Sequence, residues 1–321
     1  MNFIEQAIKM YPDLASSGVI TRKQALTVCQ QTGVRWPANI IHMDNNVSRG
    51  VFKFEVNLPI DSAPVYEESD AELNQRIEET YKTLDTLVEA VASNKVNSLI
   101  CSGAPGLGKS YEVNKILNEV NNGSEYNYIF HRGYLKATHL FRLLWENKNQ
   151  GQTIVIDDSD AIFGDETALN ILKAALELKP SRTVGWGSEK EFLDEDGEVI
   201  PRYFQYQGNV IFLTNLNFSE MASGNSKYAP HLSALESRSL VLDLKIKTKR
   251  EFIAKITQTV NKGMLRDKGI SAEEDKILLN FIVENSDKMK ELSLRAVEKL
   301  AVLYTMNRND WLPLARTVML K

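Results

Sequence analysis

The spacing of apolar positions predicts that short buried strands alternate with helices through the middle of the chain. After residue 108, for example, Val113, Ile116 and Leu117 recur at the spacing of one helix face. Apolar runs of strand length lie before and after such segments. Strands that alternate with helices predict a parallel sheet covered by helices, which is the α/β fold class. The expected core strands are residues 97–102, 126–130, 153–156, 209–215 and 240–244.

The two ends of the chain have helical patterns. Residues 21–24 have the form of a capping box, Trp36-Pro37 starts a second short helix, and residues 51–55 alternate apolar and polar side chains as a strand does. This order indicates a small helical, winged-helix-like module, for which nucleic-acid contact and protein docking both stay open. Capping boxes at 248–251 and 271–274 predict a small helical bundle at the other end.

These patterns divide the chain into four parts. Residues 57–68 contain two prolines and read as a linker, and a capping box at 69–72 then starts a long helix. The expected parts are a winged-helix-like module over 1–60, the linker and long helix over 61–95, the α/β core over 96–245, and a helical lid over 246–321.

An inserted hairpin is expected within the core, over residues 180–208. The stretches 183–186 and 203–206 favour strands, and Asp196-Gly197 between them is a tight-turn signal. The tip should repel phosphates, or it is simply an acidic solvated loop. Its acids are Glu189, Glu191, Asp194, Glu195, Asp196 and Glu198, against Lys190 alone. Residues 216–230 are rich in Ser, Asn and Gly and predict a mobile loop.

Composition indicates an ordinary soluble protein with 321 residues, 43% hydrophobic and 25% charged residues, and a formal net charge of −4. This charge excludes a protein that coats nucleic acid through bulk positive charge. The chain has no signal-peptide pattern and no apolar run of about 18 residues, so we expect it in the cytoplasm, without a membrane partner. Neither Cys29 and Cys101 nor the histidines have the spacing of a disulfide framework or metal site.

The strongest chemical signal is a glycine-rich loop between the first core strand and the helix that follows it. Its glycines let backbone N–H groups approach phosphates, and the helix that starts near Lys109 directs its partially positive end at them. Lys109 is expected to reach the β- and γ-phosphates of ATP, and the Ser110 hydroxyl to bind Mg²⁺. The expected nucleotide-binding residues are Gly103, Ala104, Pro105, Gly106, Leu107, Gly108, Lys109, Ser110 and Tyr111.

Polar residues also end the other core strands. Asp157 is expected to hold Mg²⁺, and Asp158 to polarise the attacking water. Asn215 ends the fourth strand, where its amide can orient that water, unless it is simply a strand-ending residue. After the second strand, Tyr134 and Lys136 are candidates for gripping a macromolecule, with the cation favouring a phosphate backbone. The alternative is that Tyr134 and Leu135 simply pack the start of the following helix.

The order of these motifs resembles the AAA+ family of P-loop ATPases over about residues 66–321. The resemblance implies that Asn215 is the sensor-1 residue, Arg238 the arginine finger and Arg295 the sensor-2 arginine. Where the family usually has Glu, this chain has Asp158, which is one methylene shorter. The run IDDSD also resembles small ATPases encoded by bacteriophages. The matching stretches are GAPGLGKS at 103–110, IVIDD at 154–158, IFLTN at 211–215, ESRS at 236–239 and LSLRAVEKL at 292–300.

The resemblance implies an ATPase that uses ATP and Mg²⁺ and works as a homo-oligomer, expected to be a hexameric ring. The leading hypothesis is that it moves or remodels DNA in replication, recombination or packaging. One alternative is a slow ATP-dependent switch or loader that assembles on a protein partner, with the N-terminal module as the contact. Another is an ATPase that remodels polypeptides.

Overall fold

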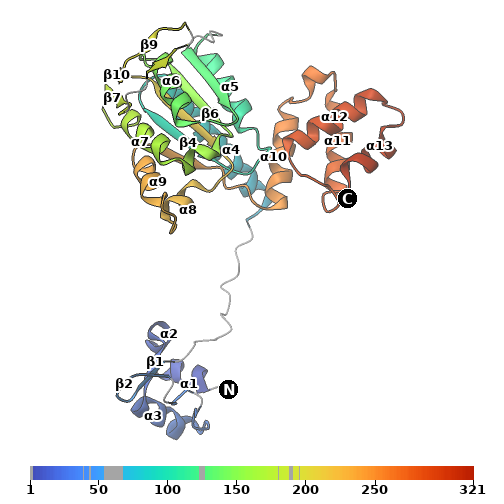
Figure 1. Cartoon of the computed structure of the whole chain (residues 1–321). Coiled ribbons are helices and arrows are strands. Elements are labelled where there is room, and N and C mark those ends of the chain that lie inside the picture. Colours follow the sequence, from blue (N-terminus) through green and yellow to red (C-terminus); the bar gives the residue numbers. More distant parts are fainter. Residues whose placement is uncertain are drawn as a thin grey trace. The chain divides into compact units, whose positions relative to one another are not determined.

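The computed structural model describes residues 3–38, 40–42, 45–53, 68–122, 127–179, 181–187, 191–194 and 196–321. The chain divides into two compact units, Met1–Glu68 and Ser69–Lys321 (Figure 1). Most of the expected linker, residues 57–67, lies outside the described residues.

In the described part of the first unit, α-helices pack on a small antiparallel sheet of order β1-β3-β2. Thr21 and Gln24 form the expected capping box at the start of α3. Its core contains Phe3, Ile20 and Val28. The described helices do not include the second short helix that was expected to start at Trp36-Pro37. The elements are α1 (Phe3–Met10), α2 (Leu14–Ser17), β1 (Val19–Thr21), α3 (Arg22–Thr32), β2 (Asn46–Ser48) and β3 (Val51–Lys53).

The second unit is built on a parallel sheet of five strands in the order β12-β4-β11-β6-β5, which confirms the α/β prediction. All residues of β4, β6 and β11 are buried, because helices cover both faces. The second strand begins two residues later than the run that predicted it. The strands are β4 (Ser98–Ser102), β5 (Tyr128–Arg132), β6 (Thr153–Asp157), β11 (Asn209–Thr214) and β12 (Leu240–Asp243).

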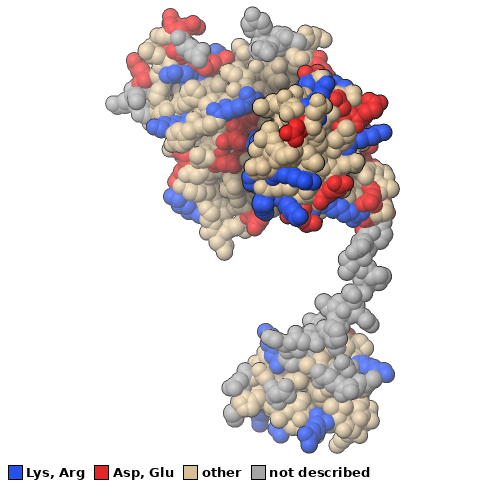
Figure 2. All heavy atoms as spheres, turned by 90° about the vertical axis from the view of Figure 1, so that its right-hand side faces the viewer, with Lys and Arg blue, Asp and Glu red and all other residues tan. Residues whose placement is uncertain are grey.

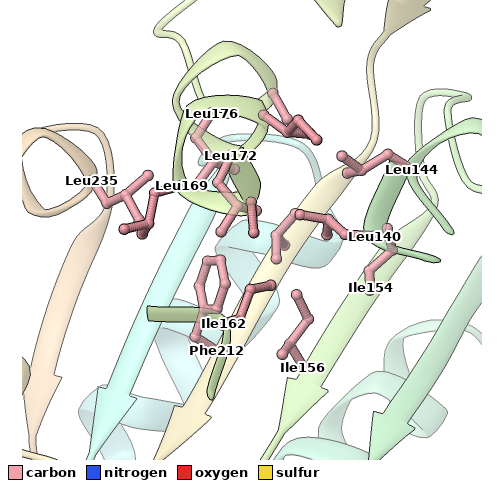
Figure 3. Packing of buried hydrophobic residues seen from close by; sticks show 14 of the residues in the cluster. Leu140, Leu144, Ile154, Ile156, Ile162, Leu169, Leu172, Leu176, Phe212 and Leu235 are labelled. Atoms are coloured by element: carbon pink, nitrogen blue, oxygen red, sulfur yellow. The ribbon is translucent and has the colours of Figure 1, made fainter. Parts of the chain in front are cut away.

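Side chains of the central strand β11 alternate between two hydrophobic cores. Val210 and Phe212 join the core formed with α6, α7 and α9, whereas Ile211 and Leu213 join the core formed with α4 and α5. Figure 3 shows Phe212 in the first of these cores, close to Ile162. The helices are α4 (Asp70–Ala92), α5 (Lys109–Val120), α6 (Ala137–Glu146), η3 (Asp160–Gly164), α7 (Glu166–Ala175) and α9 (Ala229–Glu236).

The expected hairpin insertion has two paired levels. Strands β7 (Arg182–Gly185) and β10 (Tyr203–Tyr206) pair antiparallel, and β8 (Phe192–Leu193) pairs with β9 (Val199–Ile200) beyond them. The hairpin is anchored to α6, because the Phe141 ring contacts the rings of Trp186, Phe192 and Phe204 at centroid distances of 5.6, 6.0 and 5.2 Å. Of the expected tip residues, Glu189, Lys190 and Glu195 lie outside the described part of the chain.

The expectation that residues 216–230 form a mobile loop is wrong. The segment contains the helix α8 (Phe218–Ser223) and leads directly into α9. Asn217 caps α8 by accepting a hydrogen bond from the backbone N–H of Glu220. Phe218 is fully buried, with its ring 5.1 Å from that of Phe163. One buried aromatic therefore orders a segment whose overall composition is that of a loop.

The chain ends in a helical lid with its own core, in which the Trp311 ring packs against Phe281 and Tyr304. Thr248 and Ser271 start α10 and α11 with complete capping boxes, as expected. The lid consists of α10 (Lys249–Asn261), η4 (Arg266–Lys268), α11 (Ala272–Glu284), α12 (Leu294–Met306) and α13 (Trp311–Met319).

The described surface of the second unit mixes charges of both signs. On the face shown in Figure 2, blue basic and red acidic side chains are interspersed. A search of the described helices finds none with the length and apolar character needed to cross a membrane.

We predict that Phe218→Ala lowers the free energy of unfolding of the second unit by about 3–5 kcal/mol, since it removes a fully buried aromatic side chain. Urea unfolding followed by circular dichroism would measure this change. The exposed Asn225→Ala should change it by less than about 0.5 kcal/mol. Equal, small effects of the two substitutions would show that residues 216–230 are mobile after all.

Candidate nucleotide-binding site

The glycine-rich loop joins β4 to α5, which begins at Lys109. Gly106 and Gly108 have φ angles of 74° and 83°, in the left-handed region that favours glycine. Position 106 also has no room for a side chain, because a Cβ atom at Gly106 would lie 2.4 Å from the Cβ of Ser293. The loop thus holds its backbone against the positive end of α5, as an anion-binding loop does.

Lys109 is buried and lies beneath this loop. Its ammonium donates hydrogen bonds to the carbonyl oxygens of Gly103 and Ala104 at 2.6 and 3.1 Å, and to Asn215 Oδ1 at 2.9 Å. Burial lowers the pKa of Lys109, against the opposing effect of nearby carboxylates such as Asp158. Phosphate oxygens are charged acceptors, so they can replace these neutral oxygens favourably.

Asp157 and Ser110 form a set of oxygen ligands. The Ser110 hydroxyl donates to Asp157 Oδ1 at 3.0 Å. A hydroxyl and a carboxylate are ligands that Mg²⁺ prefers, and Mg²⁺ normally takes its other ligands from water and substrate phosphates. The described residues contain no cluster of three or more His, Cys, Asp or Glu side chains suited to a metal.

Arg132 is a site residue that the sequence analysis did not assign. Its Nε donates to the second oxygen of Asp157, Oδ2, at 3.1 Å. Arg132 ends β5 directly opposite Asp157 in the parallel register of β5 and β6. The sequence offered a signal for this pairing, because Arg132 and Asp157 each end a core strand and the two strands are neighbours. Arg132 has to release this oxygen before a cation can use both oxygens of the carboxylate.

Asp158 and Asn215 meet next to Lys109. Asn215 Nδ2 donates to Asp158 Oδ1 at 2.5 Å, while the other end of the same amide accepts from Lys109. Asp158 has a φ of 55°, and its backbone N–H donates to Leu213 O at 3.1 Å. The left-handed backbone is uncommon for a residue other than glycine and often occurs at functional sites.

Thr214 and Asp160 support this arrangement and were also not assigned from the sequence. The Thr214 hydroxyl donates to Asp160 Oδ1 at 2.6 Å and accepts from the backbone N–H of Leu216 at 3.0 Å. Burial raises the pKa of Asp160. These bonds fix the backbone on both sides of Asn215.

The lid closes the site above the loop. The backbone N–H of Leu294, the first residue of α12, donates to Gly106 O at 2.8 Å. A cavity of about 500 Å³ lies between the loop, α4 and the lid, which is within the usual size range of ligand pockets. Arg295 lines this cavity together with Lys109, Asp157, Asp158 and Asn215. Tyr111 also lines it and is 69% exposed.

The remaining candidate residues lie elsewhere. Arg238 precedes the amino end of β12, whereas the glycine-rich loop follows the carboxyl end of β4. Its guanidinium donates to Ala234 O at 2.7 Å and to Glu177 at 3.3 Å. Tyr134 is 71% exposed, and the Lys136 ammonium lies 6.0 Å from its ring centroid. The adjacent Leu135 is buried, so it packs the helix start while Tyr134 faces solvent.

One curated protein is clearly similar in sequence. The uncharacterized 36.7 kDa protein in the nrdC-mobD intergenic region of Enterobacteria phage T4 is 32% identical over 266 residues, which cover 82% of this chain and 81% of that protein. No protein-family model matches the chain.

Solved structures give weaker similarities. A mutant RuvB of Thermotoga maritima is 15% identical, with a TM-score of 0.44, over 75% of this chain and 69% of that chain. NtrX from Brucella abortus in complex with ATP is 14% identical, with a TM-score of 0.40, over 72% of this chain and 50% of that chain. The α/β fold of this chain is assigned from its strand order and its glycine-rich loop.

Lys255, on α10, makes the stability of the fold depend on pH. Its side chain is buried on the Tyr81 ring, with Glu112, Asp85 and Lys262 as the charged neighbours. Burial lowers its pKa from 10.5 to about 8. The unfolded chain therefore binds more protons between pH 8 and 10.5, so this lysine makes stability rise with pH across that window.

We predict that Lys255→Met raises the free energy of unfolding at pH 7 by about 3 kcal/mol, because it removes a buried charge. It should also remove the rise in stability above pH 8. Urea unfolding at several pH values would measure both effects. Lys82→Met, at an exposed position on α4, serves as the control. Loss of stability at pH 7 in the Lys255 variant alone would contradict the prediction.

Proposed function

We propose that this chain, which belongs to the same family as the uncharacterized phage T4 protein, is a Mg²⁺-dependent AAA+ P-loop ATPase that works as an oligomer. The observation that carries the proposal is the hydrogen-bonded series Lys109–Asn215–Asp158 beside the P-loop. It connects a phosphate-binding cation with a carboxylate that can act on water. The phosphate-binding loop and the lid arginine Arg295 border the same cavity.

Each residue then has a definite task. The P-loop N–H groups and Lys109 bind the phosphates, and Ser110 and Asp157 hold Mg²⁺, which when bound would neutralise phosphate charge. Asp158 accepts a proton from the attacking water, and Asn215 positions that water. Arg295 binds phosphate charge from the lid side, so that hydrolysis changes the interaction between the lid and the core.

A slow ATP-dependent switch or loader is the second candidate function. Asp158 is one methylene shorter than glutamate, and its carboxylate already accepts a hydrogen bond from Asn215. Both features favour slow hydrolysis, because the carboxylate has to reach and deprotonate a water next to the γ-phosphate.

The oligomer is proposed to complete each site with Arg238 of a neighbouring subunit. Arg238 precedes the amino end of β12, at the opposite edge of the sheet from the P-loop, so a role at a nucleotide would require another copy of the chain. An arginine supplied in this way stabilises charge in the transition state. A hexameric ring is the closed assembly that we propose.

The proposed substrate is DNA, with polypeptide as the rival. Tyr134 and Lys136 are both exposed beside the site edge of the sheet, where an aromatic ring and a cation can stack on bases and bind phosphate. Remodelling of a polypeptide would use Tyr134 but gain little from the cation. The N-terminal unit is proposed as a further contact for nucleic acid or a protein.

We predict that Lys109→Ala abolishes ATP binding or turnover, because it removes the cation facing the phosphates. Asp158→Asn should retain ATP binding but lose most turnover, since an amide cannot accept the proton of water. Titration calorimetry and phosphate release would separate the two effects. Near-normal turnover by Asp158→Asn would refute the assigned role of this carboxylate, and lack of ATP binding by the unaltered chain would refute the proposed function.

We predict that Lys136→Ala weakens stimulation of the ATPase by single-stranded or duplex DNA and flattens its salt dependence, leaving turnover without DNA unchanged. Tyr134→Ala should reduce stimulation by any gripped substrate. Phosphate release with DNA or with an unfolded protein would be measured, and the exposed Lys227→Ala is the matched control. If Lys136→Ala has no effect and unfolded protein stimulates only through Tyr134, the polypeptide alternative is correct.

A further inference from the structure

Two polar side chains on the cavity wall have a group without a hydrogen-bond partner among the described residues. Oδ1 of Asp85, on α4, is buried and has no partner among the described residues. The ammonium of Lys255, on α10, lies 3.1 Å from the Tyr81 ring centroid and donates no hydrogen bond within the described structure. Lys255 is only 6% exposed. An unmatched polar group is costly to the fold, and a ligand in the adjoining cavity would offset this cost.

The two groups belong to one cluster. Asp85 and Lys255 both line the cavity that contains the P-loop, and the charge of each shifts the pKa of the other. Tyr81 joins the cluster to the nucleotide site, because its hydroxyl donates to the P-loop carbonyl of Leu107 at 2.7 Å. The cluster therefore borders the nucleotide cavity from the side formed by α4 and α10.

We propose that Asp85 and Lys255 recognise the adenine base of the bound nucleotide. The inference rests on the proposed function and extends it from the phosphates to the base. The Asp85 carboxylate accepts a hydrogen bond from the 6-amino group, and the Lys255 ammonium donates one to N1. Adenine carries a donor and an acceptor side by side on this edge, which matches one free acceptor and one free donor on the protein.

Hypoxanthine provides the sharpest comparison. It has the same ring system, but an oxygen acceptor replaces the 6-amino group and N1 carries a hydrogen. Both hydrogen-bonding groups are therefore reversed, and they would face a carboxylate and an ammonium with the wrong polarity. Sites built to hydrogen-bond a substrate strongly reject analogues that cannot make the bond.

The cost of the cluster to stability supports a role in binding. Burial lowers the pKa of Lys255 and raises that of Asp85, so both charged forms are held at a cost to the fold. A fold without a ligand to bind would gain from apolar side chains at these positions.

The test measures binding of ADP, IDP and inorganic tripolyphosphate to the full chain by titration calorimetry with Mg²⁺. The unaltered chain should bind ADP at least about tenfold more tightly than IDP. Asp85→Asn offers an amide donor to the oxygen of hypoxanthine, so it should reduce this ratio about tenfold. Lys255→Met should also reduce the ratio, because N1 of adenine loses its donor. Tripolyphosphate has no base, so all variants should bind it equally.

Glu78→Gln is the matched control, since Glu78 lines the same cavity but is exposed, and it should leave the ratio unchanged. Equal binding of ADP and IDP by the unaltered chain would overturn the inference, as would an unchanged ratio in Asp85→Asn. A parallel loss of tripolyphosphate binding in both cluster variants would also overturn it, because the cluster would then support the P-loop. Failure of the unaltered chain to bind any of the three ligands would instead refute the proposed function.

Discussion

The parallel register of β4, β11, β6 and β5 is the constraint on which the second unit depends. It aligns Ser102 with Thr214, Leu213 with Asp157, and Asp157 with Arg132. Residues that follow these strands are therefore delivered to one edge, although they come from distant parts of the sequence. The alternating side chains of β11 hold that edge in place through two cores. A shift of β11 by one residue would turn its side chains toward the opposite cores and move the site residues apart.

Features encoded locally could be predicted from the sequence. The strands have apolar runs, the capping boxes at Ser69, Thr248 and Ser271 are complete within four residues, and the P-loop is one continuous motif. Residues 216–230 were misjudged because ordering there comes from Phe218 packing against the distant Phe163. A single aromatic in a polar segment gives no periodic signal. The pairing of Arg132 with Asp157 was missed because it depends on the order and register of neighbouring strands and not on a local pattern.

The cluster of Asp85 and Lys255 could not be predicted either, because the two residues are far apart in the sequence. Lys255 appears in the sequence as an ordinary lysine within an amphipathic helix, and Asp85 as an acid on the long helix. Only the packing of α10 against α4 buries both groups beside the P-loop. The assignment of α4 to the second unit is essential here, because this helix forms part of the nucleotide cavity as well as preceding the core.

The close packing of Gly106 against Ser293 also limits how such a sequence can change over time. A side chain larger than hydrogen at position 106 meets the Ser293 Cβ, and its backbone conformation already disfavours any other residue. A larger residue at position 293 would press on the loop from the opposite side. Neither position can enlarge first without separating α12 from the phosphate-binding loop. Descendants of this chain should therefore inherit the two small residues as a pair.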